Sequence, residues 1–259
     1  MTKVLDLPWY ERWHMAVHNS AAAIVPGWYR VGAVAEEQTV RIDTDKRAVH
    51  VAAADRWLHY RMGWDARVAR LFRHFSVDGT IALGSGDTVI DIGANVGEFS
   101  IGAAERGAHV LAIEGDPQVF QCLRRNVEGT GIEAQQALVW KAVQELTFYS
   151  APAKADSSIF RPTENQSVTE IRLPAQPLDD LAGHLDRIDL IKCDAEGAEP
   201  EVLDGAANVL ARTRQIAIDT GPEREGQETG DDCARILESY GFTVSHSKKG
   251  RKITFGIRT

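Results

Sequence analysis

Cysteine, long apolar runs and excess positive charge are all scarce in this chain of 259 residues. Its three cysteines, Cys122, Cys193 and Cys233, are odd in number and far apart, which argues against a disulfide framework or a zinc knuckle. No window reaches the roughly 18 apolar residues that a membrane-spanning helix needs. Charge and Pro8 interrupt the N-terminus before a signal-peptide core forms. We therefore expect a cytoplasmic protein with no membrane partner.

The charge balance is acidic, with a formal net charge of −8 at pH 7. Nucleic acid is therefore not expected as a partner, because phosphate backbones are bound by basic surfaces. The eight histidines are dispersed, and each is expected to lie at the surface or in packing. His59, beside Tyr60 and Arg61, either lines a substrate pocket or belongs to the polar face of a helix.

Residues 1–86 differ in composition from the rest of the chain. They contain most of the six tryptophans, namely Trp9, Trp13, Trp28, Trp57 and Trp64. We expect an α+β N-terminal appendage that caps a substrate pocket, forms the interface of a homodimer, or does both. Its expected elements are a helix over residues 8–23, hairpin strands over 39–43 and 48–51, and a helix capped by Asp55 that continues to Phe75.

Residues 87–259 alternate between strand and helix patterns, which predicts a mostly parallel sheet covered by helices. The last two strands are joined through residues 248–250, too few for a parallel crossover, so they are expected to pair antiparallel. A C-terminal antiparallel hairpin on a parallel sheet is typical of class I methyltransferases. An insertion over residues 145–178 resembles a β-arm. The expected strands cover residues 88–92, 109–114, 136–140, 189–193, 215–219, 242–246 and 252–257, and the expected helices cover 96–106, 117–128, 199–211 and 231–240.

A glycine loop follows the first of these strands. Gly93 and Gly97 frame residues 94–96, and no glycine stands at Asn95, where dinucleotide-binding loops carry one. Those loops need bare backbone because a pyrophosphate must approach it closely. A bulkier loop preceded by Asp91 suits a ligand that lacks phosphates and carries positive charge. S-adenosylmethionine fits that description.

Glu114 ends the second strand, about 20 residues beyond the loop. A carboxylate at this spacing is placed to accept hydrogen bonds from both ribose hydroxyls of a nucleoside. The alternative is a solvated carboxylate at a strand end. Asp116, two residues later, is expected to cap the next helix, with Pro117 in its first turn.

A second group of ionisable residues follows the strand that ends at Cys193. Lys192, Asp194, Glu196 and Glu199 come within eight residues at the carboxyl edge of the expected sheet. Asp194 and Glu196 share the strand period of two, so they point to one side if the extended chain continues. The alternative interpretation is helix capping together with a salt bridge from Lys192.

These motifs resemble the FkbM family of S-adenosylmethionine-dependent methyltransferases over residues 87–259. The resemblance implies O-methylation of a hydroxyl on a saccharide or a natural-product small molecule, with S-adenosylhomocysteine as the second product. By position it implies that Glu114 binds the ribose and that Asp194 and Glu196 face the transferred methyl group. The matching motifs are residues 91–100, 112–117, 178–181, 192–199 and 202–206, and the implied donor loop consists of Asp91, Gly93, Asn95, Gly97 and Glu98.

The resemblance leaves the general base open. Family members commonly carry Glu and a nearby His after the next strand, but this chain has Asp219 followed by Thr-Gly-Pro-Glu223. We expect Asp194 or Glu196 to accept the proton of the acceptor hydroxyl, with Lys192 as an orienting or charge-balancing group.

Three alternatives remain at this stage. The first is a nicotinamide-dependent oxidoreductase, disfavoured by the missing middle glycine and by the terminal hairpin. The second is a catalytically silent adaptor with a methyltransferase fold, because a fold alone does not imply a function. The third is a metal-dependent methyltransferase. No metal is expected, yet Asp194 and Asp219 end neighbouring strands, and their carboxylates could bind Mg²⁺.

Overall fold

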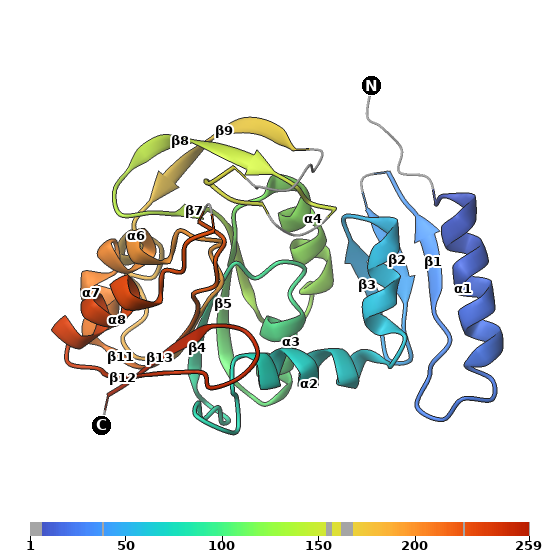
Figure 1. The fold of residues 1–259 in the computed structure, drawn as a ribbon, viewed down its shortest axis with the longest axis horizontal. Helices are drawn as coiled ribbons and strands as arrows, with labels where there is room; N and C mark the ends of the chain where they lie inside the picture. The colour runs from blue at the N-terminus through green and yellow to red at the C-terminus, as the bar shows by residue number, and fades with distance from the viewer. Residues whose placement is uncertain (1–6, 38, 154–156, 162–167, 225, 259) are drawn as a thin grey trace.

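The computed structural model describes residues 7–37, 39–153, 157–161, 168–224 and 226–258. In this part of the chain a central sheet carries helices on both faces, with an α+β layer beside it and a β-arm above it (Figure 1). The predicted α/β, Rossmann-like class is confirmed. No helix of the described ranges is both long and apolar enough to cross a membrane. The prediction about the first six residues falls outside those ranges.

The central sheet has seven strands. They are β4 (Thr88–Ile92), β5 (His109–Glu114), β6 (Glu133–Gln136), β10 (Ile188–Cys193), β11 (Thr213–Asp219), β12 (Thr243–His246) and β13 (Ile253–Ile257). Their order is β12-β13-β11-β10-β4-β5-β6. The strands from β11 to β6 are parallel, whereas β13 is antiparallel to both β11 and β12. The C-terminal hairpin predicted from its short connection is therefore confirmed.

Alternation along the strands divides the core into two layers. Val89 and Val110 face one layer, while Ile90 and Leu111 face the other, as the two-residue period of a strand requires. The first layer lies under α3 (Glu98–Glu105) and α4 (Pro117–Asn126). The second lies under α5 (Leu178–Leu181), α6 (Glu199–Asp204), α7 (Ala207–Ala211) and α8 (Gly230–Ser239).

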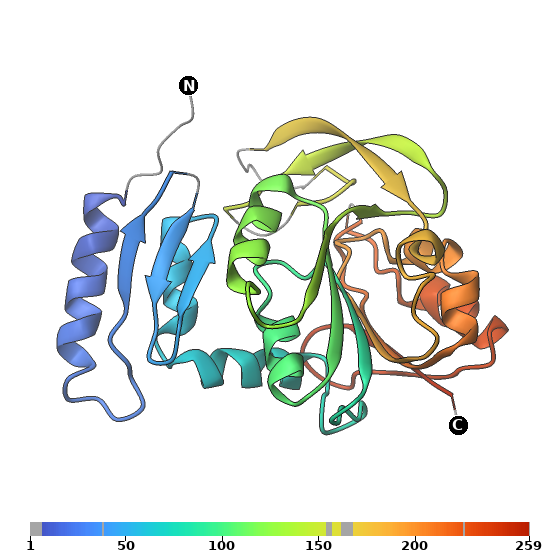
Figure 2. The same cartoon turned by 180° about the vertical axis from the view of Figure 1, so that it is seen from behind.

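The N-terminal layer lies beside α3 and α4, as the view from behind shows (Figure 2). It consists of α1 (Trp9–Ala21), β1 (Gly32–Ala35), β2 (Val40–Asp43), β3 (Ala48–Val51), the 3₁₀ helix η1 (Ala54–Tyr60) and α2 (Trp64–His74). The first helix and the hairpin of β2 and β3 agree with the prediction, but β1 was not expected. The aromatic rings of Phe72 and Phe75 pack against Phe99 of α3. Because the two parts share one core, the domain boundary at residues 86 and 87 stays a prediction.

The single helix predicted from Asp55 to Phe75 is wrong, because the chain breaks it at Gly63. Gly63 has φ +86°, a left-handed conformation that favours glycine, and a Cβ atom there would lie 2.9 Å from the Tyr29 ring. Asp45, rather than Asp55, accepts a hydrogen bond from the backbone N–H of Trp64 at 2.7 Å. The resulting bend places η1 and α2 along the same side of the sheet edge.

The expected β-arm is present as an antiparallel pair above the carboxyl ends of the parallel strands (Figure 1). It consists of β8 (Gln144–Ser150) and β9 (Thr169–Gln176), and β7 (Leu138–Val139) joins β9 in the same small sheet. The central strand predicted over residues 136–140 is therefore wrong. The polar edge strand β6 ends at Gln136, and the apolar run after it is buried beneath the arm. The apolar residues after Gln136 therefore indicate burial and do not belong to a strand of the central sheet.

The helix predicted over residues 199–211 is also wrong as one element. Gly205 separates α6 from α7, and a Cβ atom there would lie 2.3 Å from the carbonyl oxygen of Trp140. The Asp179 carboxylate accepts hydrogen bonds from the backbone N–H groups of Asn208 and Val209 and thereby starts the second helix.

Helix α1 presents an aromatic outer surface. Trp9 and Trp13 are 71% and 60% exposed, whereas Met15 on the same helix is buried. Apolar side chains of this size are seldom left exposed together on a monomer. The homodimer expected from the tryptophan-rich segment stays a prediction, and α1 is the surface on which to test it.

Candidate active site

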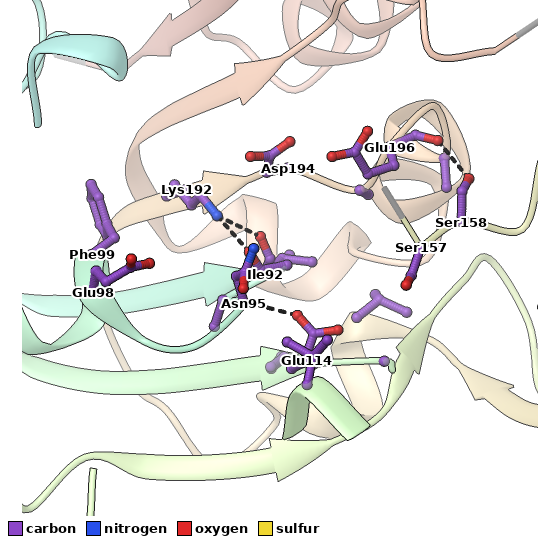
Figure 3. Close-up of a pocket in the computed structure, with 18 of the residues that line it drawn as sticks. Ile92, Asn95, Glu98, Phe99, Glu114, Ser157, Ser158, Lys192, Asp194 and Glu196 are labelled. Atoms are coloured by element: carbon purple, nitrogen blue, oxygen red, sulfur yellow. Dashed lines mark hydrogen bonds between the residues drawn. The ribbon is translucent and has the colours of Figure 1, made fainter. Parts of the chain in front are cut away.

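A cavity of about 260 Å³ lies at the carboxyl ends of β4, β5 and β10. One wall is this sheet edge, a second is formed by η1 and α2, and the arm closes the far end. Figure 3 shows Glu98 and Phe99 toward one end and Ser157 and Ser158 toward the other. Of the predicted site residues, Gly93, Asn95, Glu98, Glu114, Lys192, Asp194 and Glu196 line the cavity, whereas Asp91 and Gly97 do not.

The loop after β4 is shaped by close contacts of its backbone. Gly93 has φ +66°, and a Cβ atom there would lie 1.9 Å from the carbonyl oxygen of Asp194. Gly97 has φ +92° and would bring a Cβ atom within 2.7 Å of Leu123. Asn95, between them, is also left-handed at φ +53°, which asparagine tolerates better than most residues. The two glycines therefore let the loop pass between β10 and α4.

Glu114 is held with its carboxylate in the cavity. Its oxygens accept a backbone hydrogen bond from Asn95 at 2.9 Å (Figure 3) and another from Asp116 at 2.8 Å. Burial raises its pKa to about 7, against the lowering effect of these two N–H donors. A carboxylate offers about four acceptor positions, so two remain for a ligand. That is the number a ribose with two hydroxyls requires.

Asp91 lies below the cavity and holds Lys192. The Lys192 ammonium is 3.0 Å from Asp91 Oδ1 and donates to the carbonyl oxygens of Ile92 and Gly93 at 3.2 and 2.8 Å. Ser100 donates to the other Asp91 oxygen at 2.6 Å. Burial, the largest single influence, would lower the pKa of Lys192, but the charges of Asp91 and Asp194 and the hydrogen bond to Asp91 together outweigh it, and the pKa is raised. The pair thus fixes the loop after β4 to β10.

Asp194 and Glu196 line the cavity side by side (Figure 3). Arg251 forms an ion pair with Asp219, and its Nη1 atom lies 3.9 Å from Asp194 Oδ2. A guanidinium therefore stands between the two carboxylates that the sequence offered as magnesium ligands. Across the described ranges no group of three or more His, Cys, Asp or Glu side chains is placed to hold a metal ion.

Glu199 lies behind the cavity wall and holds the turn at Gly197 by hydrogen bonds. Its carboxylate accepts hydrogen bonds from the Gly197 N–H and from the Thr229 hydroxyl, both at 2.9 Å, and only 1% of the residue is exposed. Burial raises its pKa to about 7, although these two donors lower it in part. Gly197, with φ +97°, makes the turn that Glu199 secures.

A pH dependence of stability follows from Glu199. Because its pKa is higher in the folded state than the ordinary 4.5, its contribution is fully present below about pH 4.5 and is lost as the pH rises through about 7. We expect Glu199→Gln to remove about 3 kcal/mol of pH-dependent stability across this window. Thermal unfolding from pH 4.5 to 8 would measure it. The pKa of Glu114 is raised in the same way, so part of the pH dependence will persist in the variant. If stability changes equally with pH in Glu199→Gln and in the unchanged chain, the assignment to Glu199 is wrong.

Several lining residues were not predicted. His74, expected to be a surface or packing residue, lines the cavity together with Arg56 and Arg70, and so does His59, for which a pocket lining was one of two alternatives. Burial, more than the nearby arginines, lowers the pKa of both histidines to about 4. Their spacing along η1 and α2 gave no signal, because the bend at Gly63 that aligns these elements is a tertiary feature. The remaining unpredicted polar residues at the cavity are Arg67, Ser157, Ser158 and Arg251.

The arm is tied to the sheet by Asp116. This residue caps α4 as predicted, accepting from the N–H groups of Gln118 and Val119 at 2.8 and 3.2 Å. Its second oxygen accepts from the hydroxyls of Ser150 and Ser157, at 2.6 and 2.8 Å. One carboxylate therefore positions both the helix and the arm residues that close the cavity.

Comparison with known proteins gives one family match. Residues 91–244 match the model of the methyltransferase FkbM domain. This segment is more than half of the chain. It runs from the end of β4 through Glu114 and the acidic edge at residues 192–199 to β12.

Individual relatives are more distant. AMB antimetabolite synthetase AmbE of Pseudomonas aeruginosa is 32% identical, covering 66% of this chain and 10% of that protein. The chain thus spans about a tenth of that relative's length. Methyltransferase 1 of Beauveria bassiana is 27% identical, covering 61% of this chain and 72% of that protein. The crystal structure of precorrin-6y C5,15-methyltransferase from Geobacter metallireducens has a TM-score of 0.46 at 14% identity, covering 74% of this chain and 89% of that one.

Proposed function

This chain belongs to the FkbM family of S-adenosylmethionine-dependent methyltransferases, and we propose that it methylates a hydroxyl group of a saccharide or another small molecule. The observation that carries the proposal is the arrangement of Glu114, Asp194 and Glu196 around one cavity. Three carboxylates at the edge of a sheet suit a ligand that presents hydroxyls and a positive charge. The donor loop beside them provides no pyrophosphate-binding glycine at Asn95.

The residues present fit S-adenosylmethionine. Glu114 keeps acceptor positions for the ribose hydroxyls, while Asp194 and Glu196 provide negative charge beside the cavity. When bound, the donor supplies an electrophilic methyl group on a sulfonium. Lys192 contributes indirectly, because it is paired with Asp91 and holds the backbone of Gly93.

Alignment and proton removal are the tasks left to the protein. Holding two reactants in line can account for about 7–11 kcal/mol of a barrier. A hydroxyl acceptor must also lose its proton, and a positioned base typically contributes about 10²–10⁴-fold. We assign proton acceptance to Asp194 or Glu196, which lie next to each other at the cavity (Figure 3). Arg251, near Asp194, balances the charge of that carboxylate.

Membership of a methyltransferase family argues against the oxidoreductase alternative. Whether the chain is an active enzyme or a catalytically silent adaptor must be tested by experiment. We expect S-adenosylhomocysteine at 100 times its Kd to stabilise the chain by about 2.7 kcal/mol, or about 5–10 °C in Tm. NAD should produce no such shift. Incubation with S-adenosylmethionine and a panel of hydroxylated compounds should then yield products heavier by one methylene unit, detected by mass spectrometry.

The outcomes separate the alternatives. Binding without turnover on any hydroxylated or amine compound would favour the adaptor, and stabilisation by NAD alone would overturn the proposal. Products formed only on amines would replace O-methylation by N-methylation. Repeating the reaction in excess chelator tests the metal alternative, and we expect turnover to be retained because Arg251 stands between Asp194 and Asp219.

A further inference from the structure

The cavity wall formed by η1 and α2 is basic. Its polar side chains, which we call the cap wall, are Arg56, His59, Arg67, Arg70 and His74. On α2 the last three recur at intervals of three and four residues, so they share one face of the helix. The chain as a whole carries a net charge of −8. Positive charge at the cap wall is therefore a local feature and not a consequence of composition.

The arginines of the cap wall are only partly neutralised. Arg67 donates to Glu98 at 2.9 Å, and Glu98 also accepts from the Tyr60 hydroxyl at 2.8 Å. Burial, the largest single influence, would raise the pKa of Glu98, but the Arg67 charge, the hydrogen bonds from Arg67 and Tyr60 and the more distant Arg56 charge together outweigh it, and the pKa is lowered. Among the residues that the structure describes, Arg56 and Arg70 form no ion pair and no side-chain hydrogen bond.

The two histidines add hydrogen-bond donors without adding charge. With a pKa of about 4, His59 and His74 are neutral near pH 7, and each ring then carries one N–H group. In the described ranges, His74 Nε2 is buried and has no hydrogen-bond partner. The cap wall thus combines unpaired guanidinium groups with neutral donors, a combination suited to an oxyanion.

The opposite wall carries three carboxylates, and its two basic residues are partnered by acidic ones, Lys192 by Asp91 and Arg251 by Asp219. Glu114, Asp194 and Glu196 lie along the sheet edge, away from the cap-wall end at which Glu98 is seen (Figure 3). The acidic edge suits the cationic donor. The unpaired arginines do not suit a sulfonium, because like charges repel. Arg70 is exposed and Arg56 is half-buried, so both guanidinium groups are open to a second ligand of negative charge.

We propose that the methyl acceptor carries an oxyanion, a carboxylate or a phosphate, which Arg56 and Arg70 bind at the cap wall. The inference rests on the proposed function, because it assigns the acceptor of that reaction. Planar guanidinium groups match the paired oxygens of either anion. With the anion held there, the acceptor hydroxyl extends toward Asp194 and Glu196 at the sheet edge.

The test begins with the full chain saturated with S-adenosylhomocysteine. Inorganic phosphate and, separately, malonate are titrated in by calorimetry at constant ionic strength. We expect saturable binding that weakens at least tenfold in Arg56→Glu and in Arg70→Glu. The matched control is Arg73→Glu, which reverses an exposed charge on α2 that does not line the cavity, and it should bind both anions as the unchanged chain does. The tighter anion identifies the acceptor group.

Three results would overturn the inference. They are the absence of saturable anion binding, an equal loss in Arg73→Glu, and a matching loss of S-adenosylhomocysteine affinity in the two cavity variants. The last would mean that the cap wall binds the carboxylate of the donor. Circular dichroism checks folding, and a variant that fails it is replaced by Arg56→Gln or Arg70→Gln at the same position. If S-adenosylhomocysteine itself does not bind before any anion is added, the proposed function fails, so the two failures are distinguishable.

A turnover measurement checks the same inference independently. Pairs of hydroxylated compounds that differ only by a phosphate or a carboxylate are compared as acceptors. We expect kcat/KM to be at least tenfold higher for the charged member, and that preference should disappear in Arg70→Glu. Equal use of both members by the unchanged chain contradicts the proposal.

Discussion

Glu114→Ala should weaken S-adenosylhomocysteine binding about 100-fold or more. The carboxylate is the group we assign to the two ribose hydroxyls, and hydrogen bonds to a charged group are worth about 1.5–3 kcal/mol each. The change also removes the acceptor of the Asn95 and Asp116 N–H groups, which loosens the loop that faces the donor. Calorimetric titration gives the affinity.

Controls separate the loss of ribose contacts from a general loss of structure. Glu128→Ala removes an exposed carboxylate just beyond α4 and should leave the affinity unchanged. Glu114→Gln keeps the side-chain volume but turns an amide N–H₂ group toward one of the two backbone donors, so we expect an intermediate affinity. If Glu114→Ala remains folded and binds S-adenosylhomocysteine as tightly as the unchanged chain, Glu114 does not hold the ribose.

Asp194→Asn should lower kcat about 10²–10⁴-fold if this carboxylate accepts the proton of the acceptor. Asparagine keeps the shape of the side chain but cannot take up a proton. Arg251 retains its ion pair with Asp219 in the variant, so the cavity wall is expected to persist. Single-turnover kinetics, with donor affinity measured in parallel, separates proton transfer from binding.

Two companion variants complete this experiment. Glu196→Gln is made alongside, and the larger fall in kcat identifies which of the two carboxylates is the base. Asp186→Asn is the matched control, because Asp186 is exposed at the amino end of β10, away from the cavity. Retained turnover in both cavity variants would refute the assignment of the base. A fall in donor affinity with unchanged kcat would show that the carboxylates serve only to balance the sulfonium charge.

Local patterns predicted much of the fold. The bounds expected for β4 and β5 agree with the structure, and the short link through residues 248–250 was enough to predict the antiparallel hairpin of β12 and β13. These features depend on neighbours in the chain: alternation, helix capping and the length of a connection. The strand predicted over residues 136–140 failed because a distant segment buries that apolar run. The two long helices failed at Gly63 and Gly205, where contacts with distant residues break the helix.

The backbone conformation and the contacts of the site residues could not be predicted from local patterns. The sequence indicated the motif that contains Gly93, but only the structure shows that a Cβ atom there would strike the carbonyl of Asp194. Likewise, Asp91 was expected to bind the donor, but it lies outside the cavity lining and pairs with Lys192, which does line the cavity. A motif therefore identified the region, while contacts across the sheet decided which of its members face a ligand.

The sequence by itself determined the sheet class, the glycine loop after β4 and the acidic edge, because these depend on short motifs whose spacing is local. Only the tertiary structure decided that Arg56, Arg70, His59 and His74 line the same cavity. Their position depends on the bend at Gly63 and on the packing of α2 against α3. These four residues come from two elements that folding brings together, so a pattern of residues adjacent in the sequence does not predict their shared position.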